Sequence, residues 1–427
     1  MNTKLILTLA ALLFNFSLYA QENDQIGIGK RFSIKSEVLN ETRFYNVYLP
    51  ASYSSKQKAT YPVLYVIDGD YNFWYIAGLI EQMASIGNKI PEIIVVGIAD
   101  KGHENYINNC TPNNKNKSPN GQSEKFLEFI IGELRHKIES SYRTADFNIL
   151  VGHSLGGYFT VNALLSKPES FNAYIAISPS LWKNDYEAET QVDNFFKNNE
   201  HLNRYLFITL ANEKGMGVLG FMNKFDINTF ADEYYGNAPL GLVYKFQRYP
   251  NENHNSVGLI SISEGLKYIF SGYDVGEDEL EGMKSFAMYE ERMKPYINKI
   301  GKGFRFPESQ LTSLVRKFYN TPEMEVMQNE IQRKYVASLG DFYNALTKTQ
   351  VRNKKPDEAV STAEKNCSLN PKSPEYLATL AEALTANKQL DEAKEANRKA
   401  LEIAREIKSR QWYINQLEAD VSKTEKS

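Results

Sequence analysis

The chain has 427 residues, of which 42% are hydrophobic and 24% are charged, and its net charge at pH 7 is −3. The length allows one to three domains, the composition is that of a globular protein, and the charge argues against a nucleic-acid-binding protein, which usually has a basic face. The two cysteines, Cys110 and Cys367, fall in different predicted domains, which excludes a disulfide framework and a cysteine-based metal site.

Residues 1–20 have the layout of a secretory signal peptide. A short positive start with Lys4 precedes an apolar run from Leu5 to Leu18, and the sequence turns polar after Ala20. The run is shorter than the ~20 residues that span a bilayer. We expect cleavage after Ala20, a bacterial periplasmic or secreted location, and no membrane span in the mature chain. An uncleaved anchor is the alternative.

Residues 29–270 alternate between short β-rich runs and helical patterns. The runs are 44–49, 62–68, 93–98, 147–152, 173–178, 205–211 and 242–248, and the helical patterns include 123–140, 156–165, 223–235 and 261–270. Strands that are apolar throughout and alternate with helices indicate a mostly parallel sheet covered on both faces. We expect an α/β fold whose first two runs, with no helix between them, form an antiparallel edge.

The character of the sequence changes after residue 270. Residues 271–283 are polar and acidic and predict a linker, and residues 284–427 predict an all-α domain. Within about 340–405, the triplet Asp357-Glu358-Ala359 recurs 34 residues later as Asp391-Glu392-Ala393, with Pro371, Ala381 and Ala400 at matching places. This period resembles a tetratricopeptide repeat, and a helical bundle is the alternative. Such repeats would bind a peptide or protein partner or act as a structural cap.

The stretch Gly152-His153-Ser154-Leu155-Gly156 follows a buried strand and precedes a helix. A strand, a sharp turn with Ser at its tip and a helix form the nucleophile elbow of serine hydrolases, where neighbouring glycines let strand and helix approach. The helix N-terminus adds partial positive charge beside the serine. Ser154 is therefore the candidate nucleophile. An ordinary serine between two glycines is the alternative.

A serine nucleophile needs a histidine base, and this fold places the acid before the histidine in the chain. His254 follows the run 242–248 and precedes the last helical pattern of this domain, so it is the candidate base. Glu213 follows the run 205–211 and is the candidate acid, with Asp226, Asp232 and the earlier Asp185 as its rivals.

Two backbone N–H groups are candidates for an oxyanion hole. One belongs to Leu155, directly after the nucleophile. The other belongs to Asp70, or to Gly69, in the loop after the run 62–68. Each donor is worth about 3 kcal/mol of barrier in acyl transfer. A tight turn without a ligand is the alternative for the second position.

At this point the sequence resembles the esterase D and enterochelin-esterase-like branch of the α/β-hydrolases. Five blocks carry the resemblance in family order: VLYVIDGD, GHSLGG, SPSLW at Ser178–Trp182, ANE at Ala211–Glu213, and NENHNSV. The resemblance implies carboxyl-ester hydrolysis by the triad of Ser154, Glu213 and His254, with an oxyanion hole at Asp70 and Leu155. The family often has Gly after the histidine, where this chain has Asn255.

A second departure lies in the stretch ENYINNCTP, where Asn109 stands at a position that is often Asp and no Arg is nearby. This weakens the case for an acidic or iron-siderophore substrate. Trp182 either lines the substrate pocket or belongs to the core. We expect a serine esterase without metal or cofactor that acts on small acylated-sugar, feruloyl, acetyl or siderophore-like esters. An acyltransferase of the same fold and a silent hydrolase fold that serves as a binding module are the alternatives.

Overall fold

The computed structural model describes residues 27–425, apart from 114–120, 183–191, 193, 196, 197, 200, 221, 223, 225, 226, 229, 230 and 232–238. The predicted signal peptide and much of the predicted helix 223–235 lie outside the described residues. Across the part that is described, no helix is long and apolar enough to cross a membrane.

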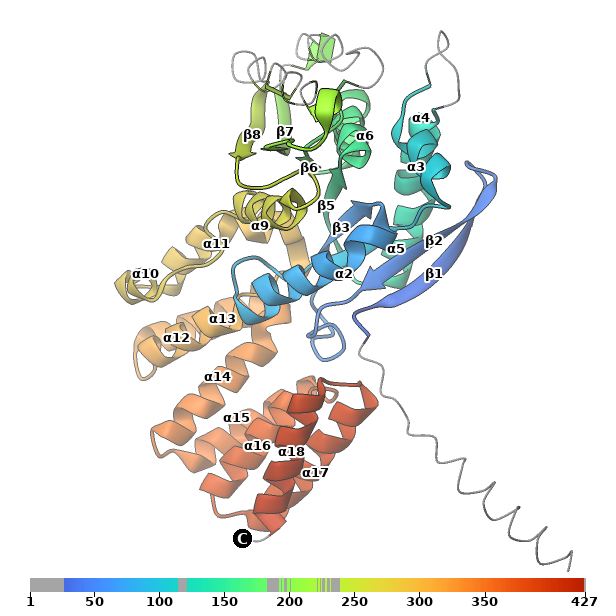
Figure 1. The fold of residues 1–427 in the computed structure, drawn as a ribbon. Coiled ribbons are helices and arrows are strands. Elements are labelled where there is room, and N and C mark those ends of the chain that lie inside the picture. The colour runs from blue at the N-terminus through green and yellow to red at the C-terminus, as the bar shows by residue number, and fades with distance from the viewer. Residues whose placement is uncertain are drawn as a thin grey trace, which may run out of the picture.

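Eight strands form one sheet in the order β1-β2-β4-β3-β5-β6-β7-β8 (Figure 1). They are β1 (Lys30–Ser36), β2 (Glu41–Tyr48), β3 (Tyr61–Ile67), β4 (Ile94–Ile98), β5 (Thr144–His153), β6 (Ala173–Ile177), β7 (His201–Ala211) and β8 (Leu240–Tyr249). From β4 to β8 all neighbouring strands are parallel, so their carboxyl ends meet along one edge of the sheet. The α/β fold that the sequence predicted is confirmed.

The antiparallel edge differs from the prediction. It is formed by β1 and β2, and β2 pairs with β4 and not with β3. The chain leaves β3 through a helix and returns as β4, which pairs with β3. β4 thus occupies the position beside β3 that the prediction gave to β2.

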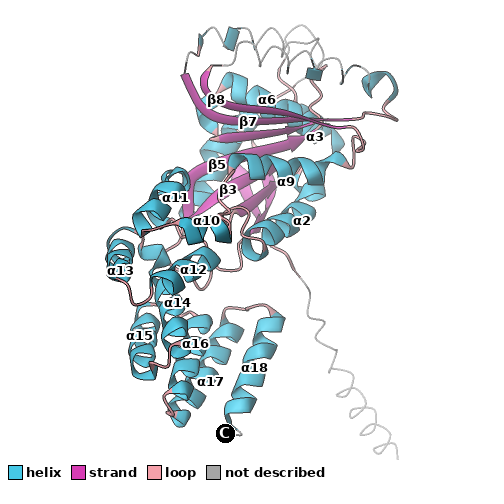
Figure 2. Cartoon of the chain, turned by 90° about the vertical axis from the view of Figure 1, so that its left-hand side faces the viewer, coloured by secondary structure: helices cyan, strands magenta, loops and turns pink. Residues whose placement is uncertain are grey.

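Helices cover both faces of the sheet, as Figure 2 shows. They are α2 (Gly69–Ile80), continued by the π-helix η1 (Glu81–Ile86), α3 (His103–Cys110), α4 (Ser123–Glu128), α5 (Arg135–Ser141), α6 (Leu155–Ser166) and α9 (Val257–Ile269); the π-helix η2 (Phe129–Leu134) joins α4 to α5. Side chains of β3 alternate between the two cores, with Leu64 and Val66 facing α2 and Tyr65 facing the α4–α6 side. This is why the strands are apolar throughout.

The rest of the described chain after α9 is helical. It contains α10 (Glu277–Gly282), α11 (Phe286–Ile300), α12 (Glu308–Phe318), α13 (Pro322–Lys334), α14 (Leu339–Arg352), α15 (Pro356–Leu369), α16 (Pro374–Ala386), α17 (Leu390–Glu406) and α18 (Gln411–Glu425). The predicted linker thus includes the short helix α10, whose Leu280 is buried. Phe147 of β5, Tyr289 of α11 and Phe306 share one core, so the first helices pack on the sheet. The domain boundary stays a prediction.

Small residues lie where the predicted repeats need them. Ala359 of α15, Ala381 of α16 and Ala393 of α17 are buried together in one small core, and Ala400 lies in the next core along the stack. Pro371 falls between α15 and α16, where it interrupts no helix. The helical region is confirmed, and its assignment as tetratricopeptide repeats stays a prediction.

Candidate active site

Ser154 lies on the bend between β5 and α6, as the motif predicted. β5 ends at His153, α6 begins at Leu155, and Ser154 has φ of 57° and ψ of −116°. A positive φ is uncommon for a residue other than glycine, and such backbone strain costs about 1–3 kcal/mol. Strain of this kind persists only where the surrounding structure enforces it, so the bend needs strong support from its neighbours.

Glycine at position 152 is one part of that support. A Cβ atom at Gly152 would lie 2.0 Å from the carbonyl oxygen of Gly156, which is far inside van der Waals contact. Strand and helix therefore approach each other as closely as the backbone permits. This explains physically why the motif begins with glycine.

Hydrogen bonds from three neighbouring segments fix the bend. The Ser154 N–H donates to the Ile177 carbonyl at 2.9 Å, and the Ser180 N–H donates to the Ser154 carbonyl at 3.0 Å. The Tyr106 hydroxyl, from α3, donates to the His153 carbonyl at 3.1 Å and accepts from the Gly156 N–H at 2.9 Å. Sequence reasoning missed Tyr106, because no motif connects α3 to the elbow.

The candidate acid and base are in contact. The Nδ1 atom of His254 lies 2.8 Å from the Oε2 atom of Glu213, and both residues are buried, with exposed fractions of 7% and 3%. Glu213 follows β7 and His254 follows β8, and the Asn212 N–H ties the two loops by donating to the Glu252 carbonyl at 2.8 Å. A carboxylate on Nδ1–H leaves the other ring nitrogen, Nε2, as the proton acceptor.

The ring of His254 lies against the elbow. Its centroid is 4.7 Å from that of His153, the residue before Ser154. Burial, and then the neighbouring His254, lower the pKa of His153 to about 4, so this imidazole is neutral at pH 7. Among the described residues, the Ser154 Oγ has one hydrogen-bond partner, the Ser180 Oγ at 3.3 Å. The structure thus brings Ser154, Glu213 and His254 to one edge without a serine–histidine hydrogen bond, which often forms only with substrate.

The two predicted oxyanion donors occupy matching positions. Asp70 lies in the first turn of α2 and Leu155 in the first turn of α6. N–H groups in a first turn have no partner within their own helix, and they point along the positive end of its dipole. The carboxyl end of β3 is next to that of β5, so both helices begin at the same edge of the sheet. Their assignment as oxyanion donors stays a prediction.

The loop before α2 is close-packed. A Cβ atom at Gly69 would lie 2.4 Å from the carbonyl carbon of Gly97. Asp68 has φ of 56°, and burial, followed by the charges of Asp100 and Asp70, raises the pKa of its carboxyl to about 6. The Asp70 carboxylate lies 3.1 Å from Arg31, so its charge is already paired.

The remaining histidines outside the elbow and the rival acids were also located. His103, His136 and His201 are exposed, and Asp185, Asp226 and Asp232 lie outside the described residues. Trp182 is half-buried, two residues after Ser180 in the loop that touches Ser154. Its role in binding substrate stays a prediction.

Asn109, where the family often has Asp, belongs to a buried polar network. Its side-chain amide donates to Asp100 at 3.0 Å, and Asp100 also accepts from Arg43 at 3.1 Å. Arg43 comes from β2 and is fully buried. An arginine is therefore near this stretch in space, but its guanidinium is used inside the protein. Among the described residues, no cluster of three or more His, Cys, Asp or Glu side chains forms a metal site.

Comparison with known proteins identifies the family. Residues 36–215 match the model of the family described as "Putative esterase". The ferri-bacillibactin esterase BesA of Bacillus subtilis is 28% identical over 255 residues, which are 54% of this chain and 86% of BesA. The structure of an IroE-like serine hydrolase from Shewanella oneidensis matches with a TM-score of 0.60 and 27% identity, over 72% of this chain and 98% of that one.

A third match includes the helical region. The structure of an uncharacterised protein from Capnocytophaga ochracea has a TM-score of 0.53 and 16% identity, and it covers 93% of this chain and 100% of that one. At this identity the likeness concerns the fold alone. The domain that carries Ser154 belongs to the esterase branch of the α/β-hydrolases, and the chain is a carboxylic-ester hydrolase.

Proposed function

We propose that the chain is an exported serine esterase in which Ser154 is the nucleophile, His254 the general base and Glu213 the acid. The observation that carries this proposal is the buried 2.8 Å contact between His254 and Glu213, next to a serine on a strained elbow. Burial of a carboxylate against an imidazole has a clear use in catalysis, because it holds one tautomer and stabilises the imidazolium that forms during the reaction.

The reaction proceeds in two halves. His254 removes the proton from the Ser154 hydroxyl as the oxygen attacks the ester carbonyl, and the resulting tetrahedral oxyanion accepts hydrogen bonds from the N–H groups of Asp70 and Leu155. The C–O bond to the alcohol breaks, and the alcohol leaves with the proton from His254. Water, deprotonated by the same histidine, then attacks the acyl-enzyme, and Ser154 regains its proton as the acid is released.

The proposed substrate is an ester that carries an aromatic group, such as a catecholate siderophore or a feruloyl ester. Two relatives support the siderophore class: BesA is named a ferri-bacillibactin esterase, and a protein of Emericella nidulans is named a siderophore enterobactin esterase. In this chain, Tyr71 and Trp74 follow Asp70 on α2 and are 83% and 63% exposed. They offer aromatic surface beside the proposed oxyanion hole.

Activity on an ester panel tests the proposal. Purified protein would be assayed with p-nitrophenyl acetate, methyl ferulate and a catecholate trilactone. We expect Ser154→Ala to lower kcat at least 10³-fold and Glu213→Gln to lower it about 10²- to 10⁴-fold, because the imidazole loses its orienting charge. Ser166→Ala, a change on the same helix away from the elbow, is the matched control. Full turnover by the Ser154 variant would overturn the proposal.

The export part of the proposal rests on residues 1–20 and has its own test. Expression in a Gram-negative host, followed by mass spectrometry of the periplasmic fraction, should give a mature chain that begins at Gln21. A full-length chain found only in the cytoplasm would contradict this part and leave the triad untouched.

A further inference from the structure

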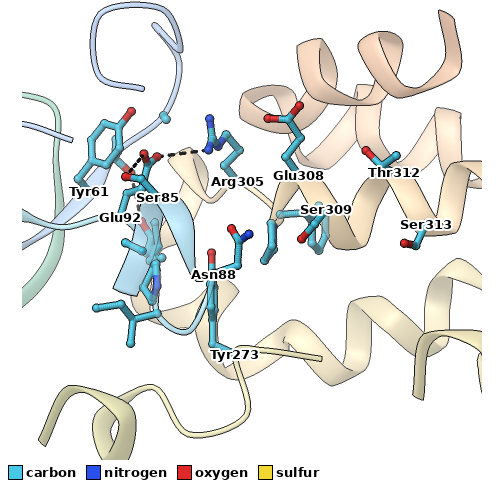
Figure 3. Close-up of a pocket in the computed structure, with 18 of the residues that line it drawn as sticks. Tyr61, Ser85, Asn88, Glu92, Tyr273, Arg305, Glu308, Ser309, Thr312 and Ser313 are labelled. Carbon is cyan, nitrogen blue, oxygen red and sulfur yellow. Dashed lines mark hydrogen bonds and ion pairs between the residues drawn. The ribbon is translucent and has the colours of Figure 1, made fainter. Parts of the chain in front are cut away.

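A cavity lies away from Ser154, where the sheet meets the C-terminal helices. Its volume is about 510 Å³, within the range of about 300–1,000 Å³ that is typical of small-ligand sites. Its walls come from the start of β3, from η1 with the loop up to Glu92, and from α12 (Figure 3). Tyr61 is at the amino end of β3, whereas the proposed oxyanion loop follows its carboxyl end, so the two sites lie on opposite edges of the sheet.

One face of α12 stays polar where it borders the cavity. Ser309, Thr312, Ser313 and Arg316 have the spacing i, i+3, i+4 and i+7, which places them on one side of the helix. The apolar side of α12 is buried in the shared core. Asn88 and Tyr273, labelled in Figure 3, also line the cavity. Ser309, Thr312 and Ser313 thus give this wall uncharged groups that both donate and accept hydrogen bonds.

Arg305 is held by ion pairs inside the protein. Its Nη2 atom lies 3.2 Å from Glu92 and its Nε atom 3.6 Å from Asp341. The charge of its guanidinium is therefore balanced by carboxylates of the protein.

Part of the charge around the cavity is balanced inside the protein. Three carboxyl groups line it, those of Glu92, Glu277 and Glu308, together with the guanidinium groups of Arg305 and Arg316. Arg305 is paired with Glu92 at 3.2 Å, so neither of these two charges needs a counterion from a ligand. The charge of Glu375, followed by burial, raises the pKa of the Glu308 carboxyl, which favours its neutral form.

We propose that this cavity binds a neutral polyhydroxylated molecule the size of a one- or two-ring sugar. Hydroxyl oxygens of the ligand accept from the Asn88 amide, and its hydroxyl protons are donated to the side-chain oxygens along α12. Tyr273, which also lines the cavity, offers ring surface to the C–H groups of the ligand. This site is separate from the proposed active site and does not depend on its chemistry.

Binding to the full chain tests the proposal by saturation-transfer NMR and calorimetry. The probes are D-glucose and maltose, with D-glucuronate and D-glucosamine as charged sugars of similar size. We expect at least one neutral sugar to bind, and the charged sugars to bind at least tenfold more weakly. No binding of the neutral sugars at 50 mM, or equal binding of the charged ones, would overturn the proposal.

Variants locate the site. Ser313→Trp fills the cavity and should abolish sugar binding, and Thr312→Val, which removes a hydroxyl at nearly constant volume, should weaken it about threefold or more. Ser368→Trp, at an exposed position on α15 outside the cavity, should bind like the original chain. Circular dichroism checks folding. Unchanged binding by a folded Ser313→Trp variant would refute this location. Ester hydrolysis measured on the same variants reports separately on the active site.

Discussion

At the scale of single residues, the candidate triad rests on strained backbone. Both Ser154 and Glu213 have positive φ, at 57° and 56°; Ser154 directly follows β5, and Asn212 alone separates Glu213 from the end of β7. A strand that ends in a sharp bend aims the next side chain out of the sheet. Such strain is retained at functional sites because the surrounding structure over-determines it. The stability of the protein is therefore expected to rise where the function is removed.

Replacing Ser154 with glycine tests whether the strained backbone lowers the stability of the protein. Glycine adopts positive φ without a Cβ clash, so Ser154→Gly should raise the free energy of unfolding by about 1 kcal/mol and abolish esterase activity. Urea denaturation measures the first effect and an aryl-ester assay the second. Ser180→Gly is the control, since Ser180 is not among the residues with positive φ, and it should be neutral or destabilising. A destabilised Ser154→Gly variant would speak against strain at the elbow.

Asp68 gives a prediction with a defined pH dependence. Its pKa is raised from an ordinary value of 3.8 to about 6, so the folded state holds this proton more tightly than the unfolded chain does. Ionising Asp68 therefore lowers the free energy of unfolding. This loss is absent below pH 4, grows between pH 4 and pH 6, and stays constant above pH 6. Asparagine tolerates the left-handed backbone at this position. Asp68→Asn should therefore raise the unfolding free energy of the protein by ~1 kcal/mol at pH 8, after allowance for solvent screening, and should leave it unchanged at pH 4.

Thermal melts at the two pH values measure this difference. Asp70→Asn is the matched control, because the Asp70 carboxylate is paired with Arg31 at 3.1 Å and the change should not stabilise at pH 8. Equal effects of Asp68→Asn at pH 4 and pH 8 would show that the Asp68 carboxyl is not destabilised by its surroundings.

The sequence revealed the residues that lie in a recognisable motif. It did not reveal the residues whose role depends only on contacts in the folded structure. Ser154, Glu213 and His254 stand out because each directly follows, or lies a few residues after, a strand-like run, and the structure brings Glu213 and His254 together. Tyr106 and His153 carry no such signature. Tyr106 reaches the elbow from α3, and the contact of His153 with His254 depends on how two loops meet in space.

At the scale of elements, the parallel strands could be predicted because burial on both faces makes them continuous apolar runs. β1 escaped prediction because its sequence, KRFSIKS, alternates polar and apolar residues at an exposed edge. The pairing of β2 was predicted wrongly because strand order depends on the crossover through α2 and not on the sequence of β2 itself. Local patterns indicate that a strand exists, and the connections decide its neighbour.

The contact between β5 and α6 gives the prediction for this scale. Gly152→Ala would force a Cβ atom to 2.0 Å from the Gly156 carbonyl oxygen, so the helix must shift away from the strand. We expect a loss of at least about 2 kcal/mol in unfolding free energy and more than tenfold in kcat. Gly132→Ala, where the added Cβ meets no atom within 4 Å, is the control and should be tolerated. Normal stability and activity of Gly152→Ala would contradict the close packing of the elbow.

At the scale of the whole molecule, a buried cluster of charges joins the sheet region to the helices. The Lys56 ammonium, from the loop between β2 and β3, lies 2.6 Å from Asp341 and 3.0 Å from Glu375, and donates to the Tyr376 hydroxyl at 2.7 Å. The two carboxylates outweigh the effect of burial and hold the pKa of Lys56 well above its ordinary value. The two regions are thus connected by charge as well as by the shared apolar core.

Removing this cation should uncouple the two regions. Lys56→Met removes the closer of the two cations that face the buried Asp341, since Arg305 lies at 3.6 Å, and it leaves the part-exposed Glu375 without this partner. We expect a loss of about 3 kcal/mol, the low end for breaking a buried pair. Calorimetry should show a lower Tm, with the helical region affected first. Lys58→Met, at an exposed position two residues away, is the control and should leave Tm nearly unchanged. An unaltered Tm for Lys56→Met would show that the cluster does not hold the regions together.

The central claim is that Ser154 is a nucleophile activated by His254 and Glu213. Labelling with a fluorophosphonate at pH 7.5, followed by intact-mass and peptide mass spectrometry, measures this directly, because only an activated serine attacks phosphorus at a useful rate. We predict one phosphonyl adduct per chain, located on Ser154, and at least 100-fold slower labelling in the folded Glu213→Gln and His254→Ala variants. No adduct on well-folded protein, or an adduct on another residue, would contradict the account.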